Sequence, residues 1–199
     1  TLTLVTGLAI FMNMSAMQGD VALAANQVLL QFLFITAYAM DGFAFAAESL
    51  VGQAMGIRNR ALVRRAAVMA GLWGGATVGA LAILFAIIGP WVIDLMTTAR
   101  DVRDEALKFL FYIVLAPPLG CAAWVFDGIF IGATRTRDMR NMMCISFLIY
   151  CAAASVLVPA FDNHGLWQAL ILSFVARGIT LGLRYPSLEA AADRAAPGG

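Results

Sequence analysis

Charged residues are scarce in this chain. Asp, Glu, Lys and Arg make up 13% of its 199 residues, against about 25% in an ordinary soluble domain. We therefore expect no sizeable soluble catalytic domain. Thirteen Lys and Arg against twelve Asp and Glu give a net charge of +1. Because nucleic-acid binding requires a basic surface that neutralises phosphates, we exclude a nucleic-acid partner.

Residues that carry catalytic or metal chemistry are also few. The three cysteines, Cys121, Cys144 and Cys151, lie in apolar stretches without CxxC spacing, so we expect neither a disulfide framework nor a zinc site. His164 is the single histidine and belongs to a turn that we expect to be solvated. The sequence contains no Ser/His/Asp arrangement and no phosphate-binding loop. We expect no enzymatic activity, no cofactor and no metal.

Apolar residues, by contrast, make up 62% of the chain, against about 45–50% in soluble domains. A bilayer-spanning helix needs about 20 mostly apolar residues, and the charge-free runs predict six of them. The predicted fold class is all-α, a polytopic transmembrane bundle of six helices. The predicted spans are about residues 1–18, 22–54, 63–92, 105–133, 140–161 and 164–184; they form one six-helix lobe over residues 1–185, and residues 186–199 form a cytoplasmic tail.

Arginines gather in alternate connecting turns and predict the orientation. Arg58 and Arg135 fall on the same side of the bundle as Arg184, because helices joined by short turns alternate in direction. The positive-inside rule then places both ends of the chain in the cytoplasm. Trp91 and Trp167 lie near the outer ends of their spans, where indole rings favour the headgroup layer. The chain opens within an apolar run, so we expect it to be part of a longer protein.

Glycines recur at four-residue spacing in several predicted spans. Small residues at this spacing let helix backbones approach closely inside a membrane. We interpret them as packing positions between helices. They are Gly71-Gly75-Gly79, Gly52/Gly56, Gly128/Gly132 and Gly178/Gly182.

Polar residues of the second predicted span share one face. An ionised side chain at the bilayer centre costs about 2.5–3.5 kcal/mol, and Asp41 lies near mid-membrane, with Glu48 two turns further on. The stripe must therefore point inward, where it would line a cavity for amphipathic organic molecules. The alternative is that these groups only hold helices together. This polar stripe consists of Gln27, Gln31, Phe34, Tyr38, Asp41, Phe45 and Glu48.

Asp127 is a further carboxylate at membrane depth, in the cytoplasmic half of its span, and it follows Trp124 by three residues. Away from water, a carboxylate can hold a proton near neutral pH or lose it to a cation that pairs with it. Coupling of transport to an ion gradient requires this property. The alternative role is a static ion pair, for which Arg177 in the last span is an available partner.

Two consecutive prolines, Pro117 and Pro118, fall near the middle of the span that carries Asp127. A proline inside a helix removes one backbone hydrogen bond and clashes with the preceding turn. We therefore predict a kink at this position. Kinked helices beside a polar site allow one bundle of a transporter to rock against another.

Three segments, taken in order and spacing, resemble a known family. They are GDVALAANQVLLQF (Gly19–Phe32), AYAMDGFAFAAESLVGQAMG (Ala37–Gly56) and DGIFIGATRTRDMRN (Asp127–Asn141). Together they resemble the carboxy-terminal half, helices seven to twelve, of a multidrug and toxin extrusion (MATE) transporter of the DinF-like branch. The resemblance implies a twelve-helix protein in the bacterial inner membrane. Its N-terminal six-helix lobe, which this chain lacks, would be the partner.

The resemblance also implies a coupling ion. In the sodium-coupled branch, this lobe contributes an acid on its first helix and a tyrosine and an aspartate on its fourth. Asp127 matches that aspartate, but Ala123 stands where the tyrosine would be. The first helix offers Asn13 and Ser15 in place of an acid. We therefore expect coupling to H⁺ rather than Na⁺.

The resulting prediction is a secondary active multidrug efflux antiporter that exports cationic and amphipathic compounds by alternating access. One alternative is a lipid-linked oligosaccharide flippase, which would need a more cationic cavity than Arg177 alone supplies. Another alternative is a non-transporting membrane scaffold or subunit. The candidate coupling or gating residues are Asp41, Glu48, Asp127 and Arg177, and the candidate drug-cavity residues are Gln27, Gln31, Phe34, Tyr38 and Trp124.

Overall fold

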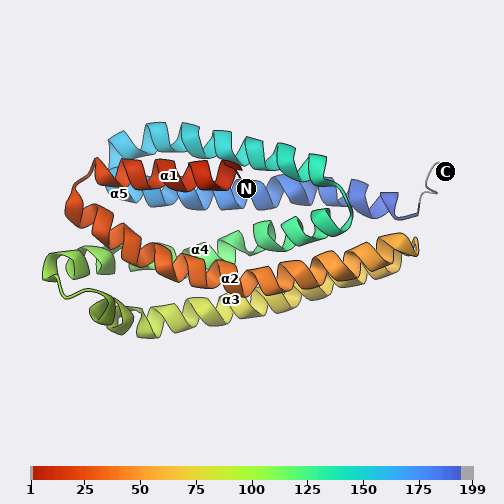
Figure 1. Ribbon diagram of the computed structural model, residues 1–199, viewed down its shortest axis with the longest axis horizontal. Coiled ribbons are helices and arrows are strands. Elements are labelled where there is room, and N and C mark those ends of the chain that lie inside the picture. Colours follow the sequence, from red (N-terminus) through yellow and green to blue (C-terminus); the bar gives the residue numbers. More distant parts are fainter. Residues whose placement is uncertain (1, 194–199) are drawn as a thin grey trace.

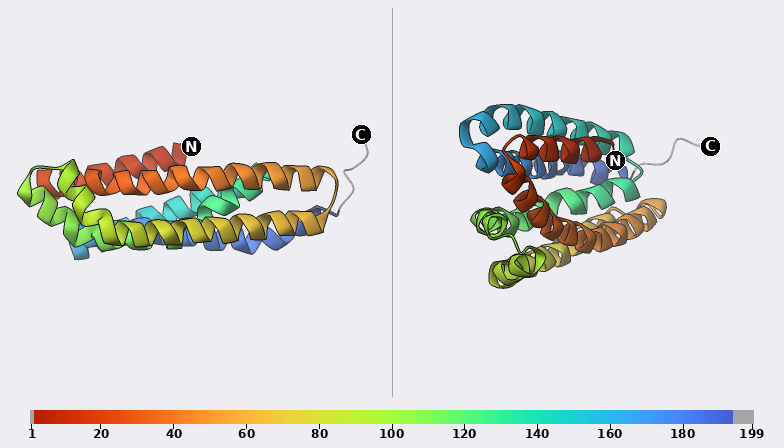
Figure 2. Two further views of the ribbon diagram at one scale, coloured as in Figure 1. Left: turned by 90° about the horizontal axis from the view of Figure 1, so that it is seen from below. Right: turned by 60° about the vertical axis from the view of Figure 1, so that its left-hand side comes forward.

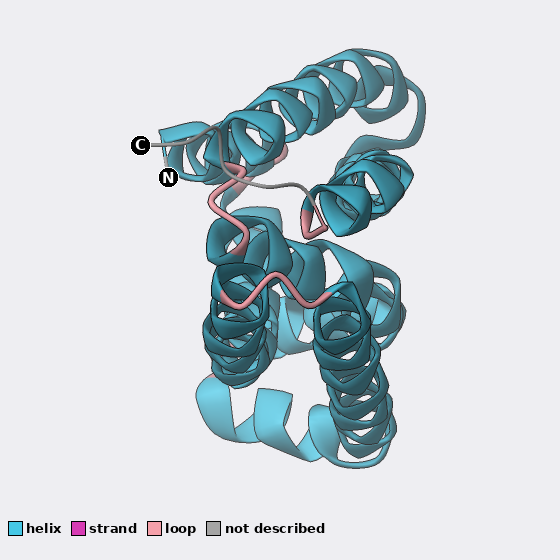
Figure 3. Cartoon of the chain, turned by 90° about the vertical axis from the view of Figure 1, so that its right-hand side faces the viewer, coloured by secondary structure: helices cyan, strands magenta, loops and turns pink. Residues whose placement is uncertain are grey.

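Five helices account for nearly all of the described residues. The computed structural model describes residues 2–193. Within them every element is a helix (Figure 3), so the predicted all-α class is confirmed. The helices are α1 (Leu2–Ala16), α2 (Asp20–Gly56), α3 (Arg60–Met96), α4 (Arg100–Gly132) and α5 (Thr136–Ala191).

Helix α5 contains two of the predicted spans. Its backbone leaves helical geometry at Asp162, with φ 50° and ψ −128°, and the chain reverses there so that two halves lie side by side (Figure 1). Gly165 allows the close approach, because a β-carbon at this position would overlap the backbone of Leu157. Residues 2–193 thus hold six helical segments. Helix α1, with 15 residues, is shorter than the about 20 that a span needs.

Helices α2, α3, α4 and α5 are each long and apolar enough to cross a membrane. They pack lengthwise, with α2 and α3 running along each other in both views of Figure 2. Large apolar side chains such as Ile83, Ile87 and Leu183 remain exposed on the outside of the bundle. Such a surface suits contact with lipid tails, since single soluble domains rarely expose extended apolar faces.

The connecting turns gather at two ends of the bundle (Figure 1). Turns 57–59 and 133–135 lie at one end together with the last turns of α5, and we name this the arginine-rich end. Turns 17–19 and 97–99 lie at the other end with the reversal at Asp162. This is the alternation that the spacing of the arginines predicts.

The two turns at the arginine-rich end share one backbone design. Arg58 and Thr134 adopt positive φ angles of 54° and 57°. In each turn the following N–H group, of Asn59 or Arg135, donates to a carbonyl five residues earlier, which satisfies an acceptor at the helix end. The Asn59 side chain then accepts a hydrogen bond from the Leu62 N–H at 3.1 Å and caps α3.

The predicted glycine packing is confirmed for one helix pair and wrong for another helix. A β-carbon at Gly128 would overlap the backbone of Ala44, and one at Gly132 the backbone of Glu48. These α4 glycines therefore let α4 approach α2 closely.

On α3, however, Gly71, Gly75 and Gly79 have no atom within 4 Å of where a β-carbon would stand. These three glycines face open space because α4 packs against the neighbouring face of α3, which carries the buried Gly74 and Val78.

One further expectation about the ends of the helices is wrong. Trp167 does not lie in a headgroup layer: it is fully buried, because its indole ring packs against Phe11. In the predicted cytoplasmic tail from residue 186, the chain remains helical as far as Ala191, and Leu188 and Glu189 are buried against the start of α3. The part of the tail formed by residues 194–199 lies outside the described residues.

Candidate functional site

Asp127 of α4 and Arg177 of α5 form an ion pair inside the bundle. The guanidinium Nη2 atom donates to the carboxylate Oδ2 atom. Only 15% of the aspartate side chain and 7% of the arginine side chain are exposed. Removing either partner would leave an uncompensated buried charge, which is strongly unfavourable. The ion pair that the sequence offered as one alternative is therefore present.

This ion pair leaves two of its own polar atoms unused. Asp127 Oδ1 and Arg177 Nε are buried and make no hydrogen bond to any of the residues described. Leaving a buried donor or acceptor unsatisfied costs about 1–3 kcal/mol, and most buried polar groups in proteins are partnered. One acceptor and one donor thus remain available for a further group, such as a proton or a polar ligand.

The ion pair lies in the wall of a partly open cavity of about 440 Å³. Residues of α1, α2, α4 and α5 line it, and aromatic side chains supply much of its surface. Trp124 and Phe174 pack with their ring centroids 5.4 Å apart. The other aromatic lining residues are Phe11, Phe34, Phe147 and Tyr150. An apolar cavity with a few polar groups at one position suits an amphipathic organic molecule.

Five of the predicted site residues meet at this cavity. Asp127 and Arg177 supply its charged wall, Phe34 and Trp124 line it, and Asp41 lies at its edge with an exposed side chain. They come from α2, α4 and α5, so residues more than 140 positions apart in the chain are brought together. No three His, Cys, Asp or Glu side chains within residues 2–193 gather closely enough to hold a metal ion.

The rest of the polar stripe of α2 does not line this cavity. Gln27 and Gln31 are exposed, as are Tyr38 at 73% and Phe45 at 68%. Glu48 is partly buried but does not line the cavity. The reason is that α2 contacts α4 through its small residues, such as the buried Ala47, Val51 and Ala54. That contact turns the polar stripe to the surface of the lobe.

The two prolines do not end α4. The backbone remains helical through both of them, from Arg100 to Gly132. Pro117 is buried in the bundle, whereas the exposed Pro118 lines a second hollow on another face of α4.

Sequence reasoning missed a buried polar network at the other end of the bundle. Asn26 Nδ2 donates to Ser15 Oγ at 2.6 Å and to Asn163 Oδ1 at 2.7 Å. Asn26 Oδ1 accepts from Trp167 Nε1 at 2.9 Å and from Asn163 Nδ2 at 3.1 Å. The signal available in the sequence was an asparagine inside an apolar run, next to the glutamine that was assigned to the polar stripe. We name these four residues the asparagine network.

His164, which we expected to be only solvated, makes specific contacts. Its side chain is exposed, but its ring packs against Phe109 with centroids 4.6 Å apart. Its Nδ1 atom lies 3.1 Å from the hydroxyl oxygen of Tyr112, within hydrogen-bonding distance. These contacts join the second half of α5 to α4 beside the asparagine network.

Comparison with known proteins places the chain in a family. A model of the MatE family matches residues 1–155. The chain belongs to the MatE family. It is 34% identical over 174 residues to DNA damage-inducible protein F of Escherichia coli. The matched region covers 84% of this chain and 36% of that protein. It is 25% identical over 180 residues to Protein DETOXIFICATION 44, chloroplastic, of Arabidopsis thaliana, covering 89% of this chain and 34% of the relative.

The structural comparison agrees with the family. The crystal structure of the eukaryotic MATE transporter AtDTX14 superimposes with a TM-score of 0.73 at 16% identity, covering 86% of this chain and 40% of that one. The predicted resemblance is therefore confirmed, and the apolar helices are those of an integral membrane protein. This MatE chain spans about a third of the length of the curated relatives it matches.

Proposed function

We propose that this MatE chain forms one lobe of a secondary active antiporter that exports cationic and amphipathic compounds in exchange for protons. One observation carries the proposal: a charged pair with unpartnered atoms, Asp127 and Arg177, lies in the wall of an aromatic cavity. The aromatic rings offer apolar contact area to a drug-sized molecule. The unpartnered Oδ1 atom of Asp127 offers a cationic compound a charged hydrogen-bond acceptor.

The exchange follows from competition for one carboxylate. When Asp127 is ionised it pairs with Arg177 and attracts a cationic compound; when it binds a proton, both attractions weaken. Proton binding and compound binding thus oppose each other at Asp127, which is the requirement for antiport. Protons are favoured over sodium because the neighbouring Ala123, on the same helix, adds no hydroxyl or carboxyl oxygen to this site. Sodium prefers several such oxygen ligands.

We further propose that the exposed polar stripe of α2 faces a second six-helix lobe across a central cleft. Its exposed amide and aromatic groups are costly against lipid tails but suit a water-filled cleft. The protein would lie in the bacterial inner membrane with both ends of this chain in the cytoplasm. The gathering of arginines at one end of the bundle supports that orientation.

A flippase for lipid-linked oligosaccharides has less support. Such a substrate carries a pyrophosphate and requires free cationic groups in the cavity. Among the described residues Arg177 is the one buried arginine, and it is already paired with Asp127.

The deciding experiment measures uptake of a fluorescent organic cation into proteoliposomes under an imposed proton or sodium gradient. This chain alone is compared with the chain joined to its upstream sequence. We expect proton-driven transport in the longer form only. Transport driven by sodium alone would overturn the coupling assignment. An absence of transport under both gradients, with folded protein present in the vesicles, would overturn the antiporter assignment.

A further inference from the structure

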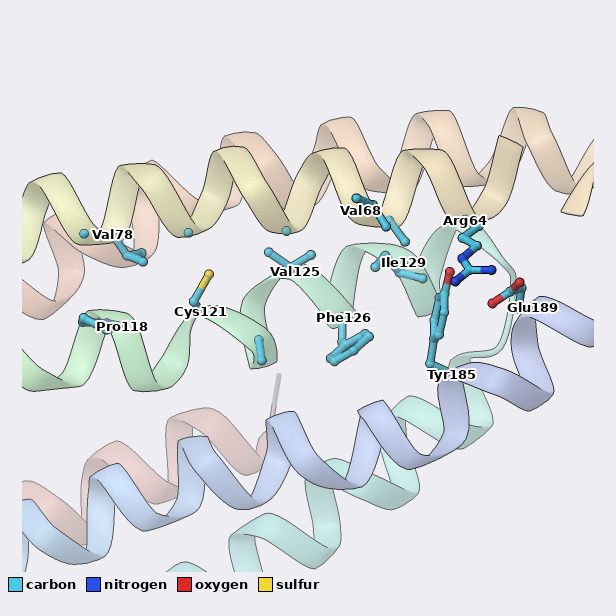
Figure 4. A pocket seen from close by; sticks show the side chains of 15 residues that line it. Arg64, Val68, Val78, Pro118, Cys121, Val125, Phe126, Ile129, Tyr185 and Glu189 are labelled. Atoms are coloured by element: carbon cyan, nitrogen blue, oxygen red, sulfur yellow. The ribbon is translucent and has the colours of Figure 1, made fainter. Parts of the chain in front are cut away.

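A second hollow opens on another face of α4, away from the ion pair. It is a groove of about 680 Å³ between α3 and α4, and it ends against the last turns of α5 (Figure 4). Gly71, Gly75 and Gly79 line it on the α3 side, where their missing side chains leave open space. We name it the α3–α4 groove.

The long walls of this groove are apolar. Val68 and Val78 border it on α3, and Cys121, Val125 and Phe126 border it on α4 (Figure 4). At 1.5 Å per residue, the stretch from residue 64 to residue 79 is about 22 Å long. One leaflet of a bilayer has about 15 Å of hydrocarbon, half of the about 30 Å core. The groove is therefore long enough to hold an extended acyl chain.

The end of the groove is polar and lies at the arginine-rich end of the bundle. Arg64, Tyr185 and Glu189 come together there (Figure 4). Glu189 pairs mainly with Arg60, whose Nε donates to its Oε1 atom at 3.0 Å. Arg64 makes no salt bridge within residues 2–193, and the buried Tyr185 hydroxyl has no hydrogen-bond partner there. One cation and one hydroxyl are thus left free at the mouth of an apolar groove.

Further arginines lie at this end of the groove, alongside the carboxylates of Glu189 and Asp193, which pair with Arg60. Arg58 in the connecting turn and Arg65 on α3 are exposed, and neither has an ion-pair partner in the part of the chain that the structure describes. Basic pockets at the ends of membrane helices attract the anionic headgroups of phospholipids. Arginine is well suited to bind their phosphate oxygens.

We propose that the α3–α4 groove binds an anionic membrane phospholipid. Its phosphate group lies between Arg64 and the Tyr185 hydroxyl, and one of its acyl chains lies along the three α3 glycines. This site is separate from the cavity that holds Asp127 and Arg177, and the proposal holds whichever compound is transported. It also explains why Gly71, Gly75 and Gly79 of α3, unlike Gly128 and Gly132 of α4, pack against no other helix.

The test uses lipids that carry a photoreactive diazirine in one acyl chain. The purified protein is reconstituted with either labelled phosphatidylglycerol or labelled phosphatidylcholine and irradiated, and labelled peptides are identified by mass spectrometry. We expect labelling of residues 64–79 and 118–129 by phosphatidylglycerol, about fivefold above that by phosphatidylcholine. Equal labelling by the two lipids would overturn the proposal. So would an unlabelled groove beside labelled outer faces, the result if another protein segment covers it.

Variants separate the two halves of the site. Arg64→Gln removes the cationic end, and we expect it to abolish the preference for phosphatidylglycerol. Arg137→Gln removes an exposed arginine from the first turn of α5 at the same end of the bundle and leaves the preference intact. Gly75→Leu fills the groove and lowers labelling by both lipids, whereas Gly42→Leu adds the same side chain to an open position on α2. Variants that match their controls in labelling would disprove the site. Gel filtration confirms that each variant is folded.

Discussion

Two groups of buried polar side chains lie toward opposite ends of this bundle and differ in how fully they are partnered. In the asparagine network, both polar atoms of the Asn26 side chain are engaged, by Ser15, Asn163 and Trp167. In the ion pair of Asp127 and Arg177, each partner keeps a buried atom without a hydrogen bond. A satisfied network holds helices in place, whereas an unsatisfied pair has unused binding capacity.

The two groups also differ in what surrounds them. The asparagine network joins α1, α2 and the second half of α5 within a packed core, and the fully buried Phe11 lies against its tryptophan. The ion pair instead borders a cavity. We therefore assign a structural role to the network and a transport role to the pair, and the following substitutions test that difference.

The largest effect is expected from Asn26→Leu. It deprives Ser15, Asn163 and Trp167 of their shared partner, and each unsatisfied buried group costs about 1–3 kcal/mol. We expect a loss of about 3 kcal/mol or more in the free energy of unfolding, measured as a lower midpoint of thermal unfolding in detergent. Transport per folded molecule should stay near that of the parent. The exposed Asn13→Leu is the control, and an equal midpoint for the two variants would refute the structural role.

The next effect is expected from Asp127→Asn, which keeps the size of the side chain and removes its charge. Because the amide cannot exchange a proton, we expect proton-driven transport to fall about tenfold or more, which corresponds to about 1.4 kcal/mol. Because the buried Arg177 loses its charge partner, we expect less folded protein than for the exposed control Asp101→Asn, so transport is compared per folded molecule. Drug resistance equal to that of the parent, at equal protein level, would remove Asp127 from the mechanism.

How far these assignments could be reached from the sequence depends on the kind of residue. Asp127 and Arg177 stand out because charges are rare in apolar runs, so both the site and its ion pair could be anticipated. The helical membrane fold follows from the same apolar runs. The sequence could not show which face of α2 packs against the rest of the lobe. Polar side chains such as Gln31 avoid lipid tails, but they do so equally well inside one lobe or in a cleft between two lobes.

Tertiary packing explains the other differences. Gly132 and Gly75 sit in the same four-residue pattern, yet Gly132 contacts the backbone of α2 while Gly75 faces an open groove. The pattern contains no information about which neighbour is present. Asn26 was overlooked for a similar reason, since its three partners lie up to 141 residues away and no local spacing connects them.

A smaller effect is expected from Trp167→Phe within the asparagine network. The change removes one donor, but Asn163 Nδ2 still donates to Asn26 Oδ1 at 3.1 Å, so no buried acceptor is left alone. The edge contact with Phe11, at a centroid distance of 5.1 Å, can persist. We expect a loss of about 1 kcal/mol, well below that for Asn26→Leu. Trp91→Phe, at a 67% exposed position, should leave the unfolding midpoint unchanged; a matching loss there would contradict the assignment.

The smallest effect is expected from Arg60→Gln, which tests whether burial rather than charge distinguishes the two groups. The Arg60 side chain is 50% exposed and pairs with Glu189 at 3.0 Å. Because solvent screens such a pair, we expect a loss of less than about 1 kcal/mol, and the difference from the parent should shrink as salt is added. A loss that equals that of Asn26→Leu and is insensitive to salt would show that charge pairing at the arginine-rich end, and not the asparagine network, is the main polar anchor of this lobe.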